Sequence, residues 1–323
     1  MKEDTAWASI GHEVAFGQSI YKVPQISEAI RETFEVTRGY QNIGVRGADF
    51  DVLFSALHGG LVSYRYGGKE LIKGIPMPNF WRAPNDNDRG NHMPARYSQW
   101  KIASLYLSHM LFDKKDILRP ELLVNENCAE IKFRYMMPTV PASECSLTYC
   151  VYGDGTIKTS LAYDPEKTLG DMPEFGVMFK FDADYNRTEW YGLGPDETYA
   201  DRNRGSKLGI YSEIVADAMA KYLVPQECGN KTGVRWAKIA DRKGRGILFS
   251  GNEMYFSALP YTPHELENAR HPFELPNVHY TVVRISQKQM GLAGDDSWGA
   301  RTHDEYLLDI SSPMLFEFSF KGI

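Results

Sequence analysis

Short runs in which apolar and polar residues alternate recur along this chain of 323 residues. Successive side chains of a β-strand point to opposite faces, so such a run predicts a strand with one buried face. In the last run, Phe316, Phe318 and Phe320 share one face. The runs that we predict to be strands are 50–54, 61–66, 129–136, 156–163, 175–181, 247–250, 279–286 and 315–320. This pattern favours an all-β chain.

Glycine-containing pairs separate several of these runs and predict hairpin turns at 59–60, 67–68 and 154–155. Helical signals are few: residues 93–105 fit one short helix, and Thr262 to Glu265 form a capping box with proline at the first helical position. The length suits either a large sandwich or two domains. Because strands dominate, we predict a large two-sheet β-sandwich.

Composition excludes several classes of protein. A net charge of −6 disfavours nucleic-acid binding, which needs a basic surface. No run of 18 apolar residues predicts a membrane span, and the first residues lack the apolar core of a signal peptide, so we expect a cytoplasmic protein. The four cysteines contain no C-x-x-C pair; we expect four reduced thiols and no metal site. Aromatic residues make up 13% of the chain, which favours strands and flat ligands such as sugars.

The run from Asn79 to Gly90 is rich in Asn and Asp. It fails as an EF-hand calcium loop, because Gly90 stands where a side-chain ligand is needed and no Glu closes the loop. Two interpretations stay open. The run is either a turn whose Asn and Asp side chains bond their own backbone, or the polar wall of a ligand site.

A second motif, residues 192–202, contains Glu197 and Asp201. A retaining glycosidase needs two carboxyl groups about 5–5.5 Å apart. We favour instead a structural role, in which Glu197 or Asp201 makes a charge-assisted bond to an arginine such as Arg202. A third motif, residues 222–227, predicts a strand followed by a turn.

Trp298 lies in a polar loop between glycines, within Gly294-Asp295-Asp296-Ser297-Trp298-Gly299. Tryptophan is usually buried, which favours a core position. The indole face also suits stacking on the C–H face of a sugar ring. Both interpretations stay open at this point.

Taken in order, these motifs resemble the C-terminal small-chain domain of glycoside hydrolase family two β-galactosidases. The resemblance covers about residues 34–323 and rests on five blocks, 80–88, 192–202, 222–227, 259–269 and 294–299. Residues 1–23 resemble the last strands of the preceding immunoglobulin-like domain. We therefore expect 1–33 to be the end of a truncated domain plus linker, with 1–23 disordered or paired with another chain.

The resemblance implies a galactose-mutarotase-like β-supersandwich. In this family the catalytic Glu pair, the Mg²⁺ and Na⁺ sites and most galactose contacts lie on a TIM barrel. No catalytic residue, metal or cofactor is therefore expected in this chain, which should be inactive alone. Its expected partners are the catalytic barrel, in the same long chain or as a large subunit, and a β-galactoside such as lactose.

The resemblance also implies which residues reach the sugar. Trp298 matches the tryptophan that forms a sugar platform, and Gly90 begins a segment, to about Ala95, that matches a mobile loop. Asp296, Asn87 and Asp88 are the further candidate substrate-binding residues. Two alternatives remain: an aldose 1-epimerase of the same fold, with Glu and His candidates among His92, His264, Glu197 and Glu227, and a stand-alone carbohydrate-binding domain.

Overall fold

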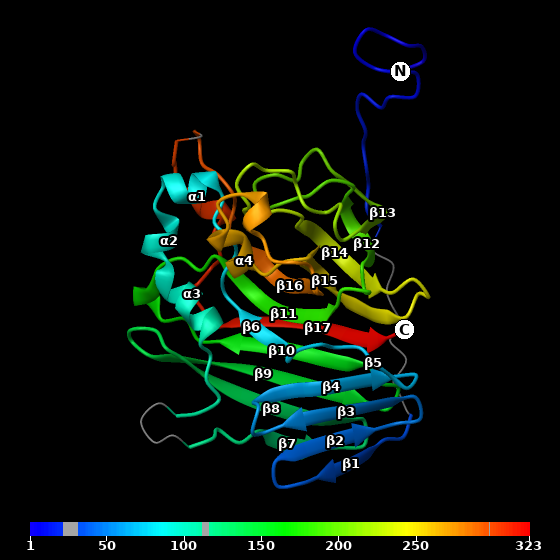
Figure 1. Ribbon diagram of the computed structural model, residues 1–323, viewed down its shortest axis with the longest axis vertical. Coiled ribbons are helices and arrows are strands. Elements are labelled where there is room, and N and C mark those ends of the chain that lie inside the picture. The colour runs from blue at the N-terminus through cyan, green and yellow to red at the C-terminus, as the bar shows by residue number, and fades with distance from the viewer. Residues whose placement is uncertain (22–31, 112–115, 297) are drawn as a thin grey trace.

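Strands dominate the computed structural model, which describes residues 1–21, 32–111, 116–296 and 298–323. Within these ranges they form two antiparallel sheets, and the all-β prediction is confirmed (Figure 1). The smaller sheet has the order β1-β2-β3-β4-β5. Its strands are β1 (Glu35–Arg38), β2 (Asn42–Arg46), β3 (Phe50–Ser55), β4 (Gly60–Tyr66) and β5 (Lys69–Glu70).

The larger sheet follows the order β13-β12-β14-β15-β17-β10-β9-β8-β7, and β16 links β15 to β11, which also pairs with β6. Its strands are β6 (Met77–Asn79), β7 (Glu121–Val124), β8 (Cys128–Met137), β9 (Ser143–Tyr152), β10 (Ile157–Tyr163), β11 (Glu174–Asp182), β12 (Arg187–Gly194), β13 (Lys207–Ile214), β14 (Lys231–Ala240), β15 (Gly246–Leu259), β16 (Tyr280–Gln289) and β17 (Met314–Gly322).

Short helices cover one side of the sandwich, where α1, α2 and α3 follow one another in Figure 1. The structure divides the helix predicted over 93–105 into two pieces at Tyr97. The capping box predicted at Thr262 is present, with both reciprocal bonds to Glu265. The helices are α1 (Asp86–Gly90), α2 (Met93–Arg96), α3 (Ser98–Leu105) and α4 (Pro263–Asn268), and the 3₁₀ turns are η1 (Lys167–Leu169), η2 (Pro272–Glu274) and η3 (Asp304–Tyr306).

The small sheet packs on the large one through aromatic side chains. The ring of Phe54 on β3 lies 6.2 Å from that of Phe133 on β8 and 5.3 Å from that of Tyr149 on β9. The Tyr64 hydroxyl donates to the Gly155 carbonyl at 2.7 Å. Burying one such aromatic side chain stabilises the fold by roughly 1.5–3 kcal/mol. The two sheets therefore share one core that supports the loops at the sandwich edge.

Burial of β16 departs from the alternation seen in β10 and β17. Every residue from Tyr280 to Ser286 is buried, including Arg284, because both faces of this strand are covered. A strand buried on both faces reads as a continuous run rather than as an alternating one. This strand leads directly into the loop that carries Trp298.

One cysteine prediction is wrong. Cys128 on β8 and Cys150 on β9 form a disulfide. In the antiparallel register Cys128 lies opposite Tyr152 and Glu130 opposite Cys150, so the two cysteines are diagonal neighbours on one face. Their Cα atoms are 5.9 Å apart, a separation that a disulfide spans. Cys145 and Cys228 are free and buried, as expected.

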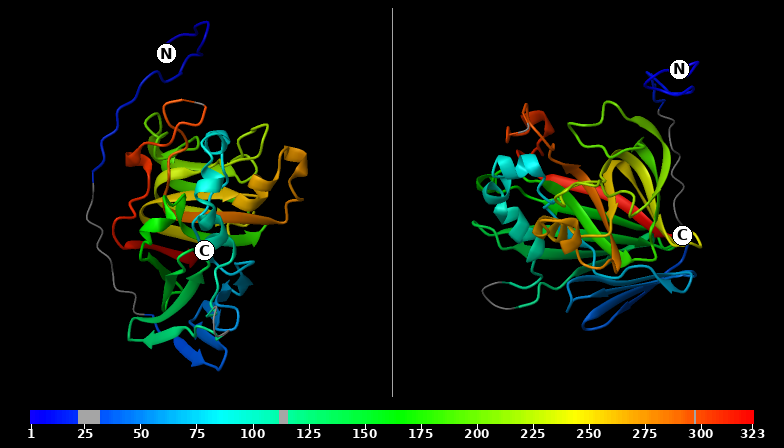
Figure 2. Two further views of the ribbon diagram at one scale, coloured as in Figure 1. Left: turned by 90° about the vertical axis from the view of Figure 1, so that its left-hand side faces the viewer. Right: turned by 45° about the horizontal axis from the view of Figure 1, so that its top comes forward.

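Residues 1–21 contain no strand, and Figure 2 shows the N-terminal end of this segment away from the sandwich. It contacts the edge strand β13: Gln18 exchanges two hydrogen bonds with the backbone of Leu208, and Glu13 pairs with Lys207. The expectations for residues 22 and 23 lie outside the described residues. The division at residue 33, and pairing with another chain, stay predictions.

Helices long and apolar enough to cross a bilayer are absent from the described part of the chain.

Candidate functional site

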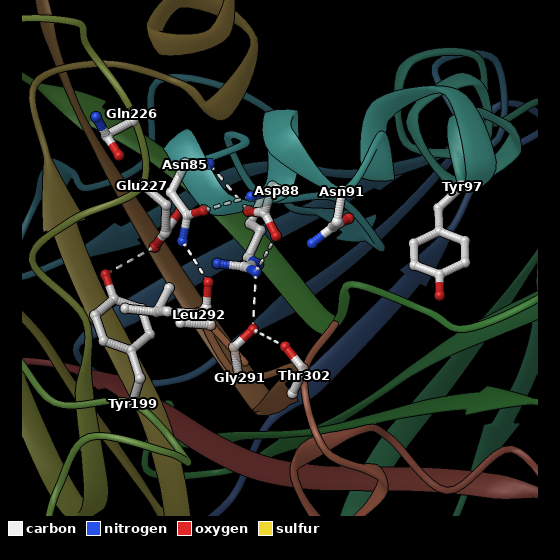
Figure 3. A network of polar contacts seen from close by, with 12 residues as sticks. Asn85, Asp88, Asn91, Tyr97, Tyr199, Gln226, Glu227, Gly291, Leu292 and Thr302 are labelled. Atoms are coloured by element: carbon white, nitrogen blue, oxygen red, sulfur yellow. Dashed lines mark hydrogen bonds and ion pairs between the residues drawn. The ribbon is translucent and has the colours of Figure 1, made fainter. Parts of the chain in front are cut away.

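The loop that carries Trp298 spans residues 291–302, of which 297 lies outside the described residues; we call it the Trp298 loop. Its base is fixed through the carbonyl groups of its first two residues. The Gly291 carbonyl accepts from Arg82 at 3.1 Å and from the Thr302 hydroxyl at 3.0 Å. The Leu292 carbonyl accepts from the Asn85 side chain at 2.9 Å. Figure 3 shows Asn85 bonded to Leu292 and Thr302 bonded to Gly291.

The two backbone N–H groups at the same base are bound by Asp201. Its Oδ2 accepts from Leu292 N at 2.7 Å and from Ala293 N at 3.0 Å. Gly291 makes this approach possible, because a Cβ there would lie 2.8 Å from the Asp201 carboxylate. Within the described residues, Asp201 thus bonds the Trp298 loop and no arginine.

Beneath this base lies a buried ion pair. Arg82 donates to Asp88 at 3.0 Å, and both side chains are buried. The other oxygen of Asp88 accepts from Asn85 N at 2.9 Å, and Asn85 in turn caps α1 by accepting from Asp88 N. Burial raises the pKa of the Asp88 carboxyl, and the Arg82 guanidinium opposes that shift. The first interpretation of residues 79–90 is therefore confirmed: Asn85 and Asp88 bond backbone N–H groups, although they do so in a capped helix.

At the tip of the loop, Asp296 holds the backbone around the tryptophan. Its Oδ1 accepts from Trp298 N at 2.8 Å and from Ala300 N at 3.1 Å. These backbone bonds hold the pKa of the Asp296 carboxyl below its ordinary value. The indole itself is 88% exposed, so the interpretation of Trp298 as a core residue is wrong for this chain.

Two glycines bring α1 and the Trp298 loop into backbone contact. Gly299 has φ +115°, and a Cβ added there would lie 2.6 Å from the carbonyl carbon of Gly90. A Cβ at Gly90 would lie 3.3 Å from the Trp298 carbonyl oxygen. Only glycine permits this approach at position 299. The structure therefore brings Gly90 next to the loop that carries Asp296 and Trp298, which lies in a separate motif of the sequence.

The segment after Gly90 is short helix rather than open loop. Arg96 donates to the Asn91 carbonyl at 3.1 Å and to its side-chain oxygen at 2.6 Å. Met93 is buried, and the Tyr97 hydroxyl donates to Asp171. Burial, with the Asp171 contact, raises the pKa of Tyr97 to about 12. That this segment is mobile stays a prediction.

The remaining candidate residues differ in accessibility. Asn87 is half-buried on α1, and its carbonyl accepts from Asn91 N at 2.9 Å. Asp88 is 1% exposed and directs both oxygens into the network of Arg82 and Asn85. In this arrangement Asp88 supports the loop from beneath and presents no open oxygen to a ligand.

A second buried cluster was not found from the sequence. Arg284 on β16 donates to Glu174 at 2.7 Å and to Glu227 at 2.6 Å. The Tyr199 hydroxyl also donates to Glu227, at 3.4 Å. Burial raises the pKa of Glu174, and Arg284 opposes that shift. The sequence signal for this cluster was Arg284 between Val283 and Ile285, and its partners Glu174 and Glu227 lie far away in the sequence.

In the motif at 192–202, Glu197 has the structural role that we expected, because it forms an ion pair with Arg202. Glu197 also accepts from Gly229 N at 2.6 Å. The strand predicted at the start of 222–227 is absent: this segment contains bends and has no ladder partners. Here Gln226 exchanges hydrogen bonds with Asp86 at the start of α1.

The epimerase alternative needs a Glu base and a His acid that face one sugar. Glu197 is held by Arg202, and Glu227 by Arg284. His264 is largely buried on α4, and its burial lowers its pKa to about 4. No hydrogen bond joins Glu197 or Glu227 to a histidine in the part of the chain that the structure covers. In the same part, no group of three or more His, Cys, Asp and Glu side chains is arranged to hold a metal ion.

Comparison with known proteins gives matches along nearly the whole chain. The family model described as "Beta galactosidase small chain" matches residues 46–321. A β-galactosidase of Halalkalibacterium halodurans is 42% identical over 100% of this chain, and a β-galactosidase small subunit of Latilactobacillus sakei is 33% identical over 87% of this chain and 95% of the subunit.

This chain spans about a third of the length of the first of these relatives, 32%. Among solved structures, a putative aldose 1-epimerase of Escherichia coli matches with a TM-score of 0.44 and 8% identity, covering 90% of this chain and 99% of that one. A galactose mutarotase-like protein of Lactobacillus casei also has a TM-score of 0.44, with 10% identity, and covers 87% of this chain and 100% of that one.

Proposed function

Because the chain belongs to the β-galactosidase small-chain family, we propose that it forms the C-terminal part of a β-galactosidase. In this proposal it completes the galactoside site of a catalytic portion that lies outside residues 1–323. The complete enzyme then hydrolyses terminal β-D-galactose residues of substrates of the lactose type. Its own contribution is the Trp298 loop, with α1 beside it.

The observation that carries this proposal is the exposed indole of Trp298 on a loop with a buried base. Burying a large apolar side chain stabilises a protein by roughly 1.5–3 kcal/mol, so leaving it in water forgoes that gain. Here the side chain is 88% exposed, while Arg82 and Asp88 fix the loop from beneath. A solvent-facing indole on a loop with a fixed base suits stacking on the apolar face of a pyranose. Asp296 holds the loop at its tip, Gly90 contacts it, and Asn87 lies on α1, the helix that ends at Gly90.

We assign catalysis to the portion outside this chain. Retaining hydrolysis needs one carboxyl group as acid and a second as nucleophile, both open to the sugar. Glu174 and Glu227 are buried against Arg284, and Glu197 is bound to Arg202 and Gly229 N. The proposal therefore places the catalytic Glu pair, and the Mg²⁺ and Na⁺ sites, in a TIM-barrel partner.

Complementation tests this proposal. The H. halodurans relative would be produced without its C-terminal third, and hydrolysis of nitrophenyl β-galactoside measured with and without this chain. We expect no activity from either part and activity from the mixture. Activity from this chain alone would contradict the assignment of catalysis elsewhere. An inactive mixture would contradict the proposal if adding back the relative's own C-terminal third restores activity.

Trp298→Ala in the active mixture then tests the role of the indole. An indole face that covers roughly 60 Å² of sugar contributes about 1.5 kcal/mol at ~25 cal/mol per Å², or about tenfold in KM. We expect KM to rise by about that factor with a smaller change in kcat. Trp298→Phe, which keeps an aromatic face, should recover part of the loss. An unchanged KM in Trp298→Ala would contradict the sugar contact.

A further inference from the structure

Asp201 binds two backbone N–H groups of the Trp298 loop. One of its oxygens accepts both N–H groups at the start of the loop, at 2.7 Å from Leu292 and 3.0 Å from Ala293. A carboxylate that accepts two backbone N–H groups makes charge-assisted bonds, which are about twice as strong as neutral ones. The contact crosses 91 and 92 residues of sequence, so it joins two separate parts of the fold.

Asp201 is itself rigidly placed. It lies in the connection between β12 and β13, inside a two-residue turn closed by reciprocal backbone bonds between Tyr199 and Arg202, at 3.1 and 3.0 Å. Tyr199 is buried, and the Arg202 side chain is bound by Glu197. The carboxylate therefore presents a fixed acceptor to the loop.

The other contacts at the loop base cannot replace this one. Arg82, Asn85 and Thr302 all donate to carbonyl oxygens of Gly291 and Leu292. Asp201 is the acceptor for the neighbouring N–H groups, so it fixes the opposite side of the same peptide units. The direction in which the chain leaves Ala293 toward Asp296 and Trp298 depends on both sets of contacts.

We propose that Asp201 is a positioning residue that sets the orientation of Trp298 through the start of the Trp298 loop. This inference rests on the proposed function for its effect on the sugar, but not for its effect on the loop. A residue that supported only the fold would change stability without changing the indole specifically.

The first experiment needs no catalytic partner. The chain would be labelled with 5-fluorotryptophan and its fluorine NMR spectrum recorded, with the Trp298 resonance assigned by Trp298→Phe. In Asp201→Ala we expect this resonance to shift, broaden or split, while that of the buried Trp100 stays in place. Asp201→Asn keeps a carbonyl oxygen as acceptor and should restore most of the wild-type position.

Asp241→Ala is the matched control. Asp241 also accepts two backbone N–H groups with one oxygen, at 2.7 Å from Lys243 and 3.1 Å from Arg245, in the turn between β14 and β15. It should leave the Trp298 resonance unchanged. If Asp201→Ala does not fold, Asp201→Ser replaces it, because its shorter hydroxyl side chain stays polar but falls short of both amides. An unmoved Trp298 resonance in a folded Asp201 variant overturns the inference.

The second experiment is a double-mutant cycle in the active mixture. Asp201→Ala should raise KM by up to the factor seen for Trp298→Ala, about tenfold, with a smaller change in kcat. In the Trp298→Ala background the same change should raise KM less than twofold. Full additivity would show that Asp201 acts independently of the indole and would overturn the inference. A mixture that stays inactive with every variant counts against the proposed function and not against the role of Asp201. The fluorine spectra still decide whether Asp201 orients Trp298.

Discussion

Breaking the buried ion pair beneath the Trp298 loop lowers the free energy of unfolding more than breaking an ion pair on the surface does. Arg82 and Asp88 lie 3.0 Å apart, with side chains that are 0% and 1% exposed. Removing one partner of a buried pair leaves the other charge uncompensated, at a cost of about 3–5 kcal/mol. We therefore expect Asp88→Asn, which keeps the shape but not the charge, to lower the free energy of unfolding by about 3 kcal/mol in urea denaturation.

Glu317 gives the matched comparison for this prediction. It pairs with Lys158 at 2.8 Å, but the two side chains are 45% and 42% exposed. Surface ion pairs contribute about 0–1 kcal/mol, so Glu317→Ala should change the free energy of unfolding by less than 1 kcal/mol. Equal losses in the two variants would show that Arg82 keeps its charge compensated without Asp88.

At the scale of elements, α1 and the Trp298 loop act as one unit through the contact of Gly90 with Gly299. Gly299 has φ +115° and no room for a Cβ, whereas the nearest atom to a Cβ at Gly90 would lie 3.2 Å away. We expect Gly299→Ala to separate the two segments and to speed hydrogen exchange of the Ala300 amide by at least tenfold. This amide donates to Asp296 in the native loop. Gly90→Ala should have a smaller effect; the reverse order would contradict the steric argument.

The strands show which features of the fold can be predicted from the sequence. Alternation predicted β10 and β17, because each has one buried and one partly exposed face, and it predicted β11, whose second half alternates in the same way. It could not reveal the ion pairs of Arg284 on β16, where both faces are buried, nor the bond from Asp201 to Leu292. Those contacts depend on which distant segments meet. The glycines at 90, 291 and 299 were visible, but their purpose appears only when their neighbours are known.

For the whole molecule, one shared core predicts that residues 34–323 fold without the segment before them. Of that segment the structure describes residues 1–21 and 32–33. Residues 1–21 touch the sandwich through exposed side chains: Gln18 bonds the Leu208 backbone, and Glu13 pairs with Lys207. Exposed contacts of this kind contribute about 0–1 kcal/mol each. The hydrophobic core, in contrast, lies within the two sheets.

We therefore expect the free energy of unfolding of residues 34–323 to lie within about 1 kcal/mol of that of the full chain, with a single cooperative transition in urea. Lys207→Ala in the full chain is the control, because it removes the contact with Glu13 and leaves the segment in place. A loss of several kcal/mol on deletion would contradict the division at residue 33. Such a result would mean that the first 33 residues belong to the same cooperative unit as the sandwich.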